Sequence, residues 1–302
     1  TPYEGYYTQD EARDIVEYAR QRHIVVVPEI DMPGHQLAAL AAMPNLGCTG
    51  GPYKVGTVWG VYDDILCLGN EDTYNFCEDV LSELIDIFPS EVIHIGGDEA
   101  PTVRVEHCPK CQALMQREHL TPKNIQGYFT NRIEKFVNSK GRRIMGWDEI
   151  MDGDINTSAM VHCWRNPSFG IKAAQKGHDV VLSPTKYCYF DFYQANPRAV
   201  HEPLAIGGYL PVDSVYNMDT MPKDISPENR KHIIGIQANL WTEYVAVPNH
   251  AEYMLLPRMA ALAENAWVKD RGPYSAFLPR LTRLKSLYDV YNLHYANHVW
   301  KK

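Results

Sequence analysis

Apolar positions along the chain alternate between stretches with helical spacing and short runs of β-branched residues. Residues 10–23 carry their apolar side chains at helical intervals, and Thr8 precedes them with Glu11 three positions later. That arrangement is typical of a capping box at the start of a helix. Residues 24–30 then form a nearly continuous apolar run. Such a run predicts a strand that is buried on both faces.

The same order of helix and then strand continues toward the C-terminus. Each predicted helix precedes a short apolar segment, and the C-terminal part of the chain, including 253–264, looks mostly helical. Strands that alternate with helices predict a parallel sheet. The other predicted helices lie around 71–88, 122–140 and 168–176, and the other strands at 92–95, 143–147, 159–164, 179–183 and 233–238.

Polar or aromatic residues follow nearly every predicted strand, as Asp98 and Glu99 follow 92–95. Functional groups at the C-terminal ends of parallel strands are typical of a TIM barrel. The competing doubly wound sheet usually has a glycine-rich phosphate loop after its first strand, which this sequence lacks. We therefore expect an α/β fold of the (β/α)8 TIM-barrel type. About six of the eight strand–helix units are recognised, so residues 1–302 are expected to form one partial barrel domain without its first two units.

Composition and charge narrow the function without naming a partner. The 302 residues carry a formal net charge of −8, which argues against a nucleic-acid partner because such proteins need a basic face. No apolar run is long enough for a membrane span. The seven cysteines are scattered, and Cys108 and Cys111 form a CxxC pair without a second pair at zinc-finger spacing. A loop disulfide or two free thiols is favoured there over a metal or redox site.

The sharpest chemical signal is the segment His94-Ile95-Gly96-Gly97-Asp98-Glu99. Two adjacent carboxylates at the open end of a strand raise each other's pKa, and a raised pKa suits a general acid. The alternative is a helix N-terminus, which also favours acidic residues. Neighbours on one strand tend to point in different directions, so these two acids cannot easily flank one glycosidic bond. In a glycosidase of this kind, the nucleophile would come from elsewhere, plausibly from the substrate.

Several motifs together resemble glycoside hydrolase family 20, the β-N-acetylhexosaminidases. The His-x-Gly-Gly-Asp-Glu segment at 94–99 is similar to the signature of that family, and further similar segments follow its order over essentially the whole chain. These segments are Pro28 to His35, Gly146 to Glu149, Trp164-Arg165, Tyr189 to Asp191, Gln237 to Glu243 and Leu262 to Trp267.

The resemblance implies retaining, substrate-assisted hydrolysis, a named exception to the scheme with two catalytic carboxylates. The 2-acetamido oxygen of the sugar would attack the anomeric carbon and form an oxazolinium-like intermediate. Glu99 would act as general acid and then as general base, and Asp98 would accept the acetamide N–H. Tyr189 would donate to the acetamide oxygen. His35 would belong to the hydrogen-bond network around Glu99.

The resemblance also assigns groups that bind the sugar. Asp191 and Glu243 would hydrogen-bond its hydroxyl groups, and three aromatic residues, Trp147, Trp164 and Trp241, would wall the pocket. Each role has a structural alternative. The tryptophans can be barrel core, Tyr189 can pack in its loop, His35 can cap a helix, Asp191 can be a turn residue and Glu243 can start an exposed helix. We expect Glu29, Asp31, Asp148 and Glu149 to be supporting groups, and His94 and His162 to be core residues.

The expected activity is that of an exo-glycosidase that removes terminal β-linked N-acetylhexosamine from glycans or chitooligosaccharides, without cofactor or metal. The alternative is a non-catalytic sugar-binding fragment; a metal hydrolase with His94, Asp98 and Glu99 as ligands is disfavoured. The family's sugar-gripping arginine and the aspartate that pairs with His35 are expected in the two missing units. We therefore expect low activity and self-association through open barrel edges. The CxxC segment resembles bacterial members, which suggests a periplasmic or extracellular location.

Overall fold

The first described helix is capped by the side chains of Thr8 and Glu11. The computed structural model describes residues 5–196, 198 and 200–300, which fall into two compact units, one ending at Val161 (unit 1) and one beginning at His162 (unit 2). Helix α1 (Gln9–Arg20) starts at Thr8, whose hydroxyl accepts the Glu11 N–H while its own N–H donates to the Glu11 carboxylate. The predicted capping box is confirmed.

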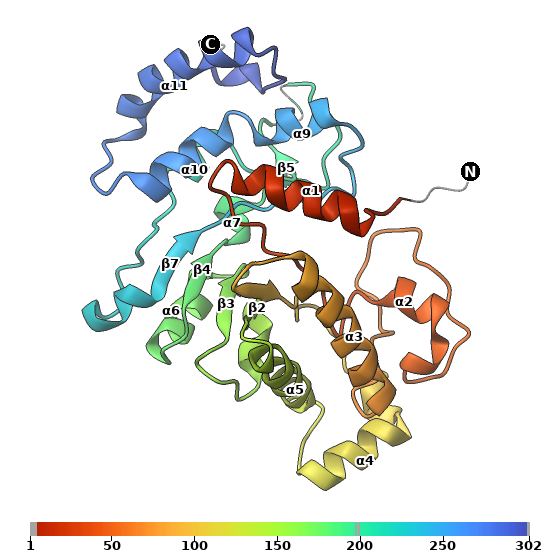
Figure 1. Ribbon diagram of the computed structural model, residues 1–302. Coiled ribbons are helices and arrows are strands. Elements are labelled where there is room, and N and C mark those ends of the chain that lie inside the picture. Colours follow the sequence, from red (N-terminus) through yellow and green to blue (C-terminus); the bar gives the residue numbers. More distant parts are fainter. Residues whose placement is uncertain (1–4, 197, 199, 301–302) are drawn as a thin grey trace. The chain divides into compact units, whose positions relative to one another are not determined.

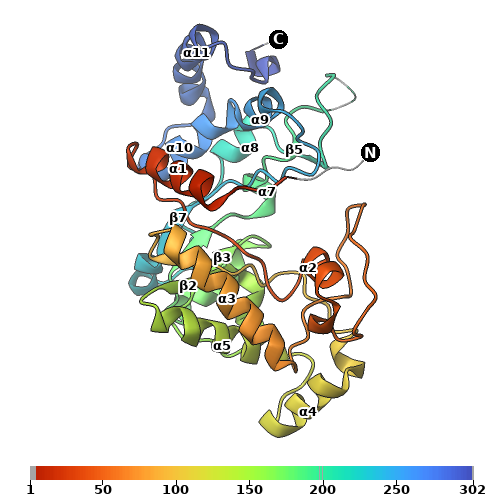
Figure 2. The same ribbon diagram turned by 45° about the vertical axis from the view of Figure 1, so that its right-hand side comes forward.

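Unit 1 is built around two parallel strands, β1 (Val92–His94) and β2 (Arg143–Trp147), with Ile93 opposite Ile144. Helices α3 (Glu71–Ile87) and α5 (Ile125–Ser139) precede these strands and lie side by side (Figures 1 and 2). Their apolar stripes are buried, as the sequence pattern predicts. Strand β3 (Met160–Cys163) crosses the boundary between the units.

The predicted strand at 24–30 is wrong over most of its length. Only Glu29 forms an isolated parallel bridge, to His94, and the flanking hydrogen bonds run from His94 N to Pro28 O and from Ile30 N to His94 O. Ile24 and Val25 are 57% and 69% exposed. Hydrogen bonding to β1 begins only at Pro28, so the β-branched residues before Pro28 lie outside the sheet.

Unit 1 also contains short elements around its loops. Helix α4 begins at the CxxC pair, so the loop expected there is in fact a helix start with Cys108 as N-cap. The other elements are α2 (Leu37–Ala42), η1 (Pro44–Leu46), η2 (Val105–His107), α4 (Pro109–Glu118) and η3 (Asp148–Asp152).

Unit 2 continues the parallel sheet pattern. Strand β4 (Val180–Leu182) pairs with β7 (Ile233–Ile236), and the Ser183 N–H donates to Cys163 O at the end of β3. Helix α6 (Pro167–Gln175) packs on β4. The long insertion between β4 and β7 holds α7 (Thr185–Cys188), β5 (Phe192–Tyr193), β6 (Gly207–Tyr209), α8 (Val212–Tyr216) and η4 (Pro227–His232).

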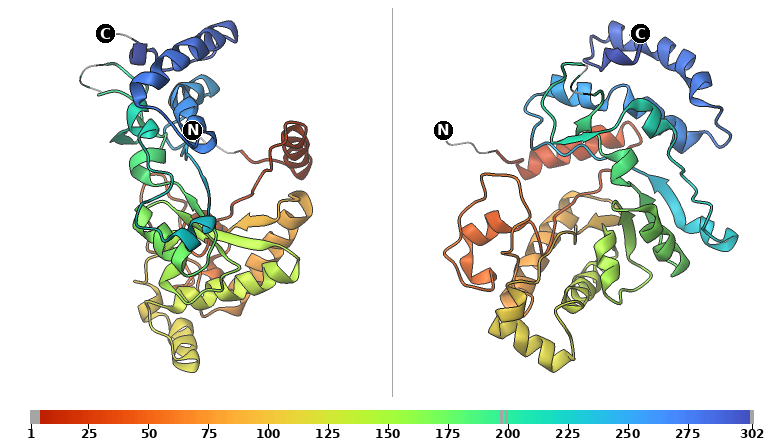
Figure 3. Two further views of the ribbon diagram at one scale, coloured as in Figure 1. Left: turned by 90° about the vertical axis from the view of Figure 1, so that its left-hand side faces the viewer. Right: turned by 180° about the vertical axis from the view of Figure 1, so that it is seen from behind.

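The C-terminal part is helical, as predicted, and forms the blue helices of Figure 3; among them, α10 packs on α8, α9 and β7. The segment 253–264 contains a break, because Pro257 has no N–H to donate and cannot continue a helix. Among the described residues, no helix has the length and apolar character that a membrane span requires. The elements are α9 (Pro248–Leu255), α10 (Arg258–Trp267), α11 (Tyr274–Val290) and η5 (Asn297–Trp300).

Candidate active site

The acid pair stands in a loop with left-handed backbone geometry. The φ angles of Gly96, Gly97 and Glu99 are 66°, 96° and 46°. Because this is not strand backbone, the side chains do not alternate, and the expectation that Asp98 and Glu99 point in different directions is wrong. Both carboxylates approach one imidazole: His35 Nε2 lies 3.4 Å from Glu99 Oε2 and 3.8 Å from Asp98 Oδ2. The two carboxylates therefore converge on one histidine nitrogen.

Close backbone approaches hold His35 and Asp31 against this loop. A Cβ on Gly96 would lie 1.9 Å from Asp31 Oδ1, and one on Gly34 would lie 3.0 Å from the Asp98 carbonyl oxygen. The Gly97 N–H donates to Asp31 Oδ1 at 2.9 Å. No described helix begins at the acid pair, since the next element is η2 at Val105, so the helix-terminus interpretation of the two acids is wrong.

Burial and like charge perturb the acids of this loop. Burial raises the pKa of Glu99, the charge of Asp98 raises it further, and His35 partly opposes both. The mutual effect expected for paired acids is thus found at Glu99. Burial raises the pKa of Asp31 well above its usual range, and the charge of the neighbouring Asp98 raises it further. Asp31 was expected only as a supporting group, and no local feature of the sequence indicates its contact with Asp98.

The same loop contains a set of groups with the spacing of metal ligands. Donor atoms of Asp31, His35 and Asp98 lie within 4.8 Å of one another. Burial and the charge of Asp98 favour the neutral form of Asp31, and no metal role is assigned to this group. The alternative ligand set with His94 is not brought together, because the His94 Nδ1 accepts the Gly96 N–H and lies 3.3 Å from Glu29 Oε1.

The Trp147 side chain is buried in the protein and is not exposed at a pocket surface. Its side chain is 2% exposed, its Nε1–H donates to Glu29 Oε1 at 3.0 Å, and its ring meets His94 edge-on at 4.9 Å. Glu29 therefore has the expected supporting role. The expectation that His94 and His162 are core residues is confirmed, since they are 3% and 1% exposed. Contact of Trp147 with a sugar stays a prediction.

Unit 2 brings another group of predicted residues together. The rings of Trp164 and Tyr189 stack with centroids 6.1 Å apart at 28°. Tyr189 follows α7 and forms an isolated parallel bridge with Asn239, beyond the end of β7. Trp241 lies two residues later and is 37% exposed. The stacked pair thus stands where the chain after β4 meets the chain after β7.

Asp191 is buried beside charged groups of unit 2. It is 4% exposed, and its Oδ1 accepts no hydrogen bond from the described residues. Burial raises the pKa of Asp191 to about 6; the charge of Glu243 adds to this, and that of Arg258 opposes it. Glu243 itself is exposed. A buried carboxylate oxygen without a donor is suited to accept a hydrogen bond from a hydroxyl group of a ligand.

Arg258 is a residue that sequence analysis did not single out. It is fully buried at the start of α10, and burial lowers its pKa to about 9. Its guanidinium donates to Phe192 O at 3.0 Å, Leu210 O at 3.1 Å and Phe190 O at 2.5 Å. Arg258 thereby holds the loop that carries Asp191. An arginine within an otherwise apolar segment was the available signal.

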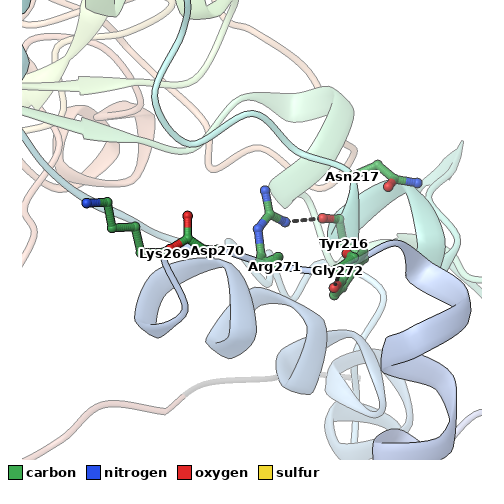
Figure 4. A pocket seen from close by; sticks show the side chains of 6 residues that line it. All are labelled: Tyr216, Asn217, Lys269, Asp270, Arg271 and Gly272. Atoms are coloured by element: carbon green, nitrogen blue, oxygen red, sulfur yellow. Dashed lines mark hydrogen bonds between the residues drawn. The ribbon is translucent and has the colours of Figure 1, made fainter.

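One hollow of unit 2 lies outside the predicted site. Its volume is about 470 Å³, and the Arg271 guanidinium there donates to the Tyr216 carbonyl oxygen (Figure 4). None of the predicted site residues lines it, so no role in the chemistry is assigned to it. The lining residues are Tyr216, Asn217, Lys269, Asp270, Arg271 and Gly272.

Comparison with known proteins places this geometry in a family. Residues 1–270 match the model of the glycosyl hydrolase family 20 catalytic domain. A β-hexosaminidase of Porphyromonas gingivalis is 40% identical over 98% of this chain and 38% of its own length. The structure of an exo-β-N-acetylglucosaminidase of Vibrio harveyi, in complex with N-acetylglucosamine, matches 99% of this chain and 47% of that one, with a TM-score of 0.86 and 32% identity.

A Streptomyces coelicolor β-N-acetylhexosaminidase matches 98% of this chain and 57% of its own, with a TM-score of 0.81 and 29% identity. These solved structures are of the TIM-barrel type, so the expected fold class is confirmed. The chain spans less than half the length of the Porphyromonas and Vibrio harveyi proteins. With its acid pair, its histidine and its parallel strands in the family's order, the chain belongs to glycosyl hydrolase family 20.

Proposed function

We propose that the protein is a retaining exo-glycosidase that releases terminal β-linked N-acetylhexosamine. The observation that carries the proposal is that Asp98 and Glu99 both approach the same nitrogen of His35. Conventional retaining enzymes need an acid and a nucleophile on opposite sides of the scissile bond. Two carboxylates on one side leave the nucleophile to the substrate, and the 2-acetamido group of the sugar can supply it.

In the first step, the acetamide oxygen attacks the anomeric carbon while the bond from that carbon to the leaving oxygen breaks. Protonated Glu99 gives its proton to the leaving oxygen, which its raised pKa favours. The ring of the resulting oxazolinium intermediate carries positive charge. Asp98 accepts the acetamide N–H and stabilises that charge, while burial and the charge of Asp98 favour the protonated form of Asp31.

In the second step, water attacks the anomeric carbon from the side of the departed group. Glu99, now a carboxylate, removes the proton of that water, and the acetamide oxygen leaves the anomeric carbon. Two displacements at one carbon retain the β configuration. His35 is 3.4 Å from Glu99 Oε2, so it can stabilise the carboxylate form that this step requires.

Residues of unit 2 are proposed to bind the sugar itself. The Tyr189 hydroxyl would donate a hydrogen bond to the acetamide oxygen, and Asp191 Oδ1, which has no hydrogen-bond partner among the described residues, would accept one from a sugar hydroxyl. Glu243 would accept a second hydroxyl. Three aromatic residues would provide apolar faces for the sugar and its acetamide methyl, namely Trp147, Trp164 and Trp241.

The proposed substrates are glycans or chitooligosaccharides with a terminal N-acetylhexosamine. The relatives' names support this class, since the solved Vibrio harveyi enzyme is an exo-β-N-acetylglucosaminidase that binds N-acetylglucosamine. We further propose a periplasmic or extracellular location and self-association of the chain through its sheet edges. Ile24, Val25 and Val27 lie just before the segment that pairs with β1, and their exposed apolar side chains support self-association.

The test compares Glu99→Gln and Asp98→Asn with the exposed control Glu83→Gln. Both active-site changes should lower hydrolysis of a chitooligosaccharide by roughly 10²–10⁴-fold. Glu99→Gln should spare aryl glycosides with good leaving groups, which need little acid assistance. A thiazoline mimic of the cyclised intermediate should inhibit the unmodified protein. Unchanged hydrolysis in both variants would refute the roles, and saturable sugar binding without any hydrolysis would favour a non-catalytic sugar-binding protein.

A further inference from the structure

Four cysteine thiols of unit 1 converge at the start of α4. Cys108 caps this helix and Cys111 lies in its first turn. Cys48 follows η1, and Cys67 follows Leu66, which forms an antiparallel bridge with Gly47. Figures 1 and 2 show α4 beside the segment that follows α2. Three stretches of chain that are distant in sequence therefore contribute to one cluster.

The spacing of the four sulfur atoms matches a tetrahedral metal site. The Sγ atoms of Cys67 and Cys108 are 3.6 Å apart, those of Cys67 and Cys111 are 3.7 Å apart, and those of Cys48 and Cys111 are 3.9 Å apart. All four lie within 4.8 Å of one another. Zinc binds thiolates at about 2.3 Å, so the corners of a regular ZnS₄ tetrahedron lie about 3.8 Å apart.

The alternatives fit these distances less well. A disulfide brings two sulfurs to about 2.05 Å, and every cysteine here is free, so of the two alternatives expected for Cys108 and Cys111 the loop disulfide is wrong and the free thiols are found. In an iron–sulfur cluster each cysteine binds one of several irons that sulfide bridges, which spreads the cysteine sulfurs further apart. Four thiolates of one charge also repel one another, and a single divalent cation is the simplest group that compensates them.

The surroundings hold the sulfurs in place. Cys67, Cys108 and Cys111 are at most 4% exposed. The Cys67 N–H donates to Leu46 O at 2.8 Å, and the Gly69 N–H donates to the Cys111 sulfur. A Cβ on Gly69 would lie 2.2 Å from the Lys110 carbonyl carbon, so only glycine permits this approach. The Gly69 N–H at the Cys111 sulfur, and the helix start at Cys108 and Cys111, both favour thiolates.

We propose that Cys48, Cys67, Cys108 and Cys111 bind one structural zinc ion. The ion has four protein ligands and no open position, so its role is to hold the chain rather than to act on substrate. It ties together the two segments that leave the acid site, one running from His35 to Cys48 and the other from Glu99 to Cys108. The CxxC pair alone did not predict the site, because its partners are 41 and 63 residues away.

The experiment measures metal in the purified protein by inductively coupled plasma mass spectrometry. The expected content is about one zinc per chain, with no comparable amount of iron. Replacement by cobalt should give the visible absorption of a tetrahedral tetrathiolate complex. Cys111→Ser should lower the zinc content at least about tenfold, whereas Cys77→Ser, which changes a buried cysteine outside the cluster, should leave it unchanged.

The metal analysis and the cobalt spectrum use the unmodified protein, so the test does not depend on whether Cys111→Ser folds. Zinc content near zero, iron in its place, or a disulfide between any two of the four cysteines by mass spectrometry would overturn the proposal. A cobalt spectrum of oxygen or nitrogen ligation would do the same. None of these readouts involves sugar hydrolysis, so the result is independent of the proposed enzymatic activity.

Discussion

Asp191 should cost the native protein stability at neutral pH, and Asp191→Asn should recover it. Burial raises the pKa of this carboxyl from 3.8 to about 6. Below about pH 4 it is protonated in both the folded and the unfolded chain, and the raised pKa costs nothing. Between about pH 4 and pH 6 the unfolded chain releases this proton while the folded chain still holds it, so rising pH favours unfolding. The cost is at most about 3 kcal/mol, from 1.36 kcal/mol per pKa unit.

The assay is urea unfolding of the unmodified protein and of Asp191→Asn between about pH 4 and pH 8. The variant's advantage in free energy of unfolding should grow between about pH 4 and pH 6 and level off above about pH 6. Asp270→Asn, at an exposed aspartate of the same unit, should show no such growth. Glu243→Gln should reduce the effect, because the charge of Glu243 contributes to the raised pKa of Asp191. A difference that is constant with pH would refute the reasoning.

Three further predictions concern the acid loop and Arg258. Hydrolysis should be lost as the pH rises through the raised pKa of Glu99. Because His35 lowers that pKa, His35→Gln should move the loss to higher pH. A pH profile of kcat/KM that does not shift in the variant would contradict this prediction. Gly96→Ala should destabilise the protein by more than about 2 kcal/mol, because the new Cβ would clash with Asp31 and the φ angle is 66°. The control Gly141→Ala, at a φ of 73° with open space around it, should cost only about 1–2 kcal/mol, and thermal melts of the two variants check this. Arg258→Met should lower the free energy of unfolding by about 3–5 kcal/mol and Arg258→Lys should lower it by less, as measured by urea unfolding. If Arg258→Met is as stable as the unmodified protein, the buried hydrogen bonds of Arg258 do not stabilise the fold.

Contiguous residues carry most of what could be predicted. The capping box at Thr8 and Glu11 depends on groups three residues apart, and the strand 143–147 is bounded as predicted because its apolar run is unbroken. The acid pair was recognised for the same reason, since it and its glycines lie in one short segment. Its orientation was not predicted, because strand alternation does not apply to left-handed backbone.

The sequence by itself determined the alternation of helices and strands, the family and the position of the two acids, because each depends on local periodicity or on adjacent residues. Only the tertiary structure decided that 24–27 is exposed, that burial and the charge of Asp98 raise the pKa of Asp31, and that Arg258 binds carbonyls up to 68 residues away. It alone brought Cys48 and Cys67 to the CxxC pair. Burial and charge pairing depend on contacts between distant segments, and the spacing of residues along the chain does not specify which segments meet.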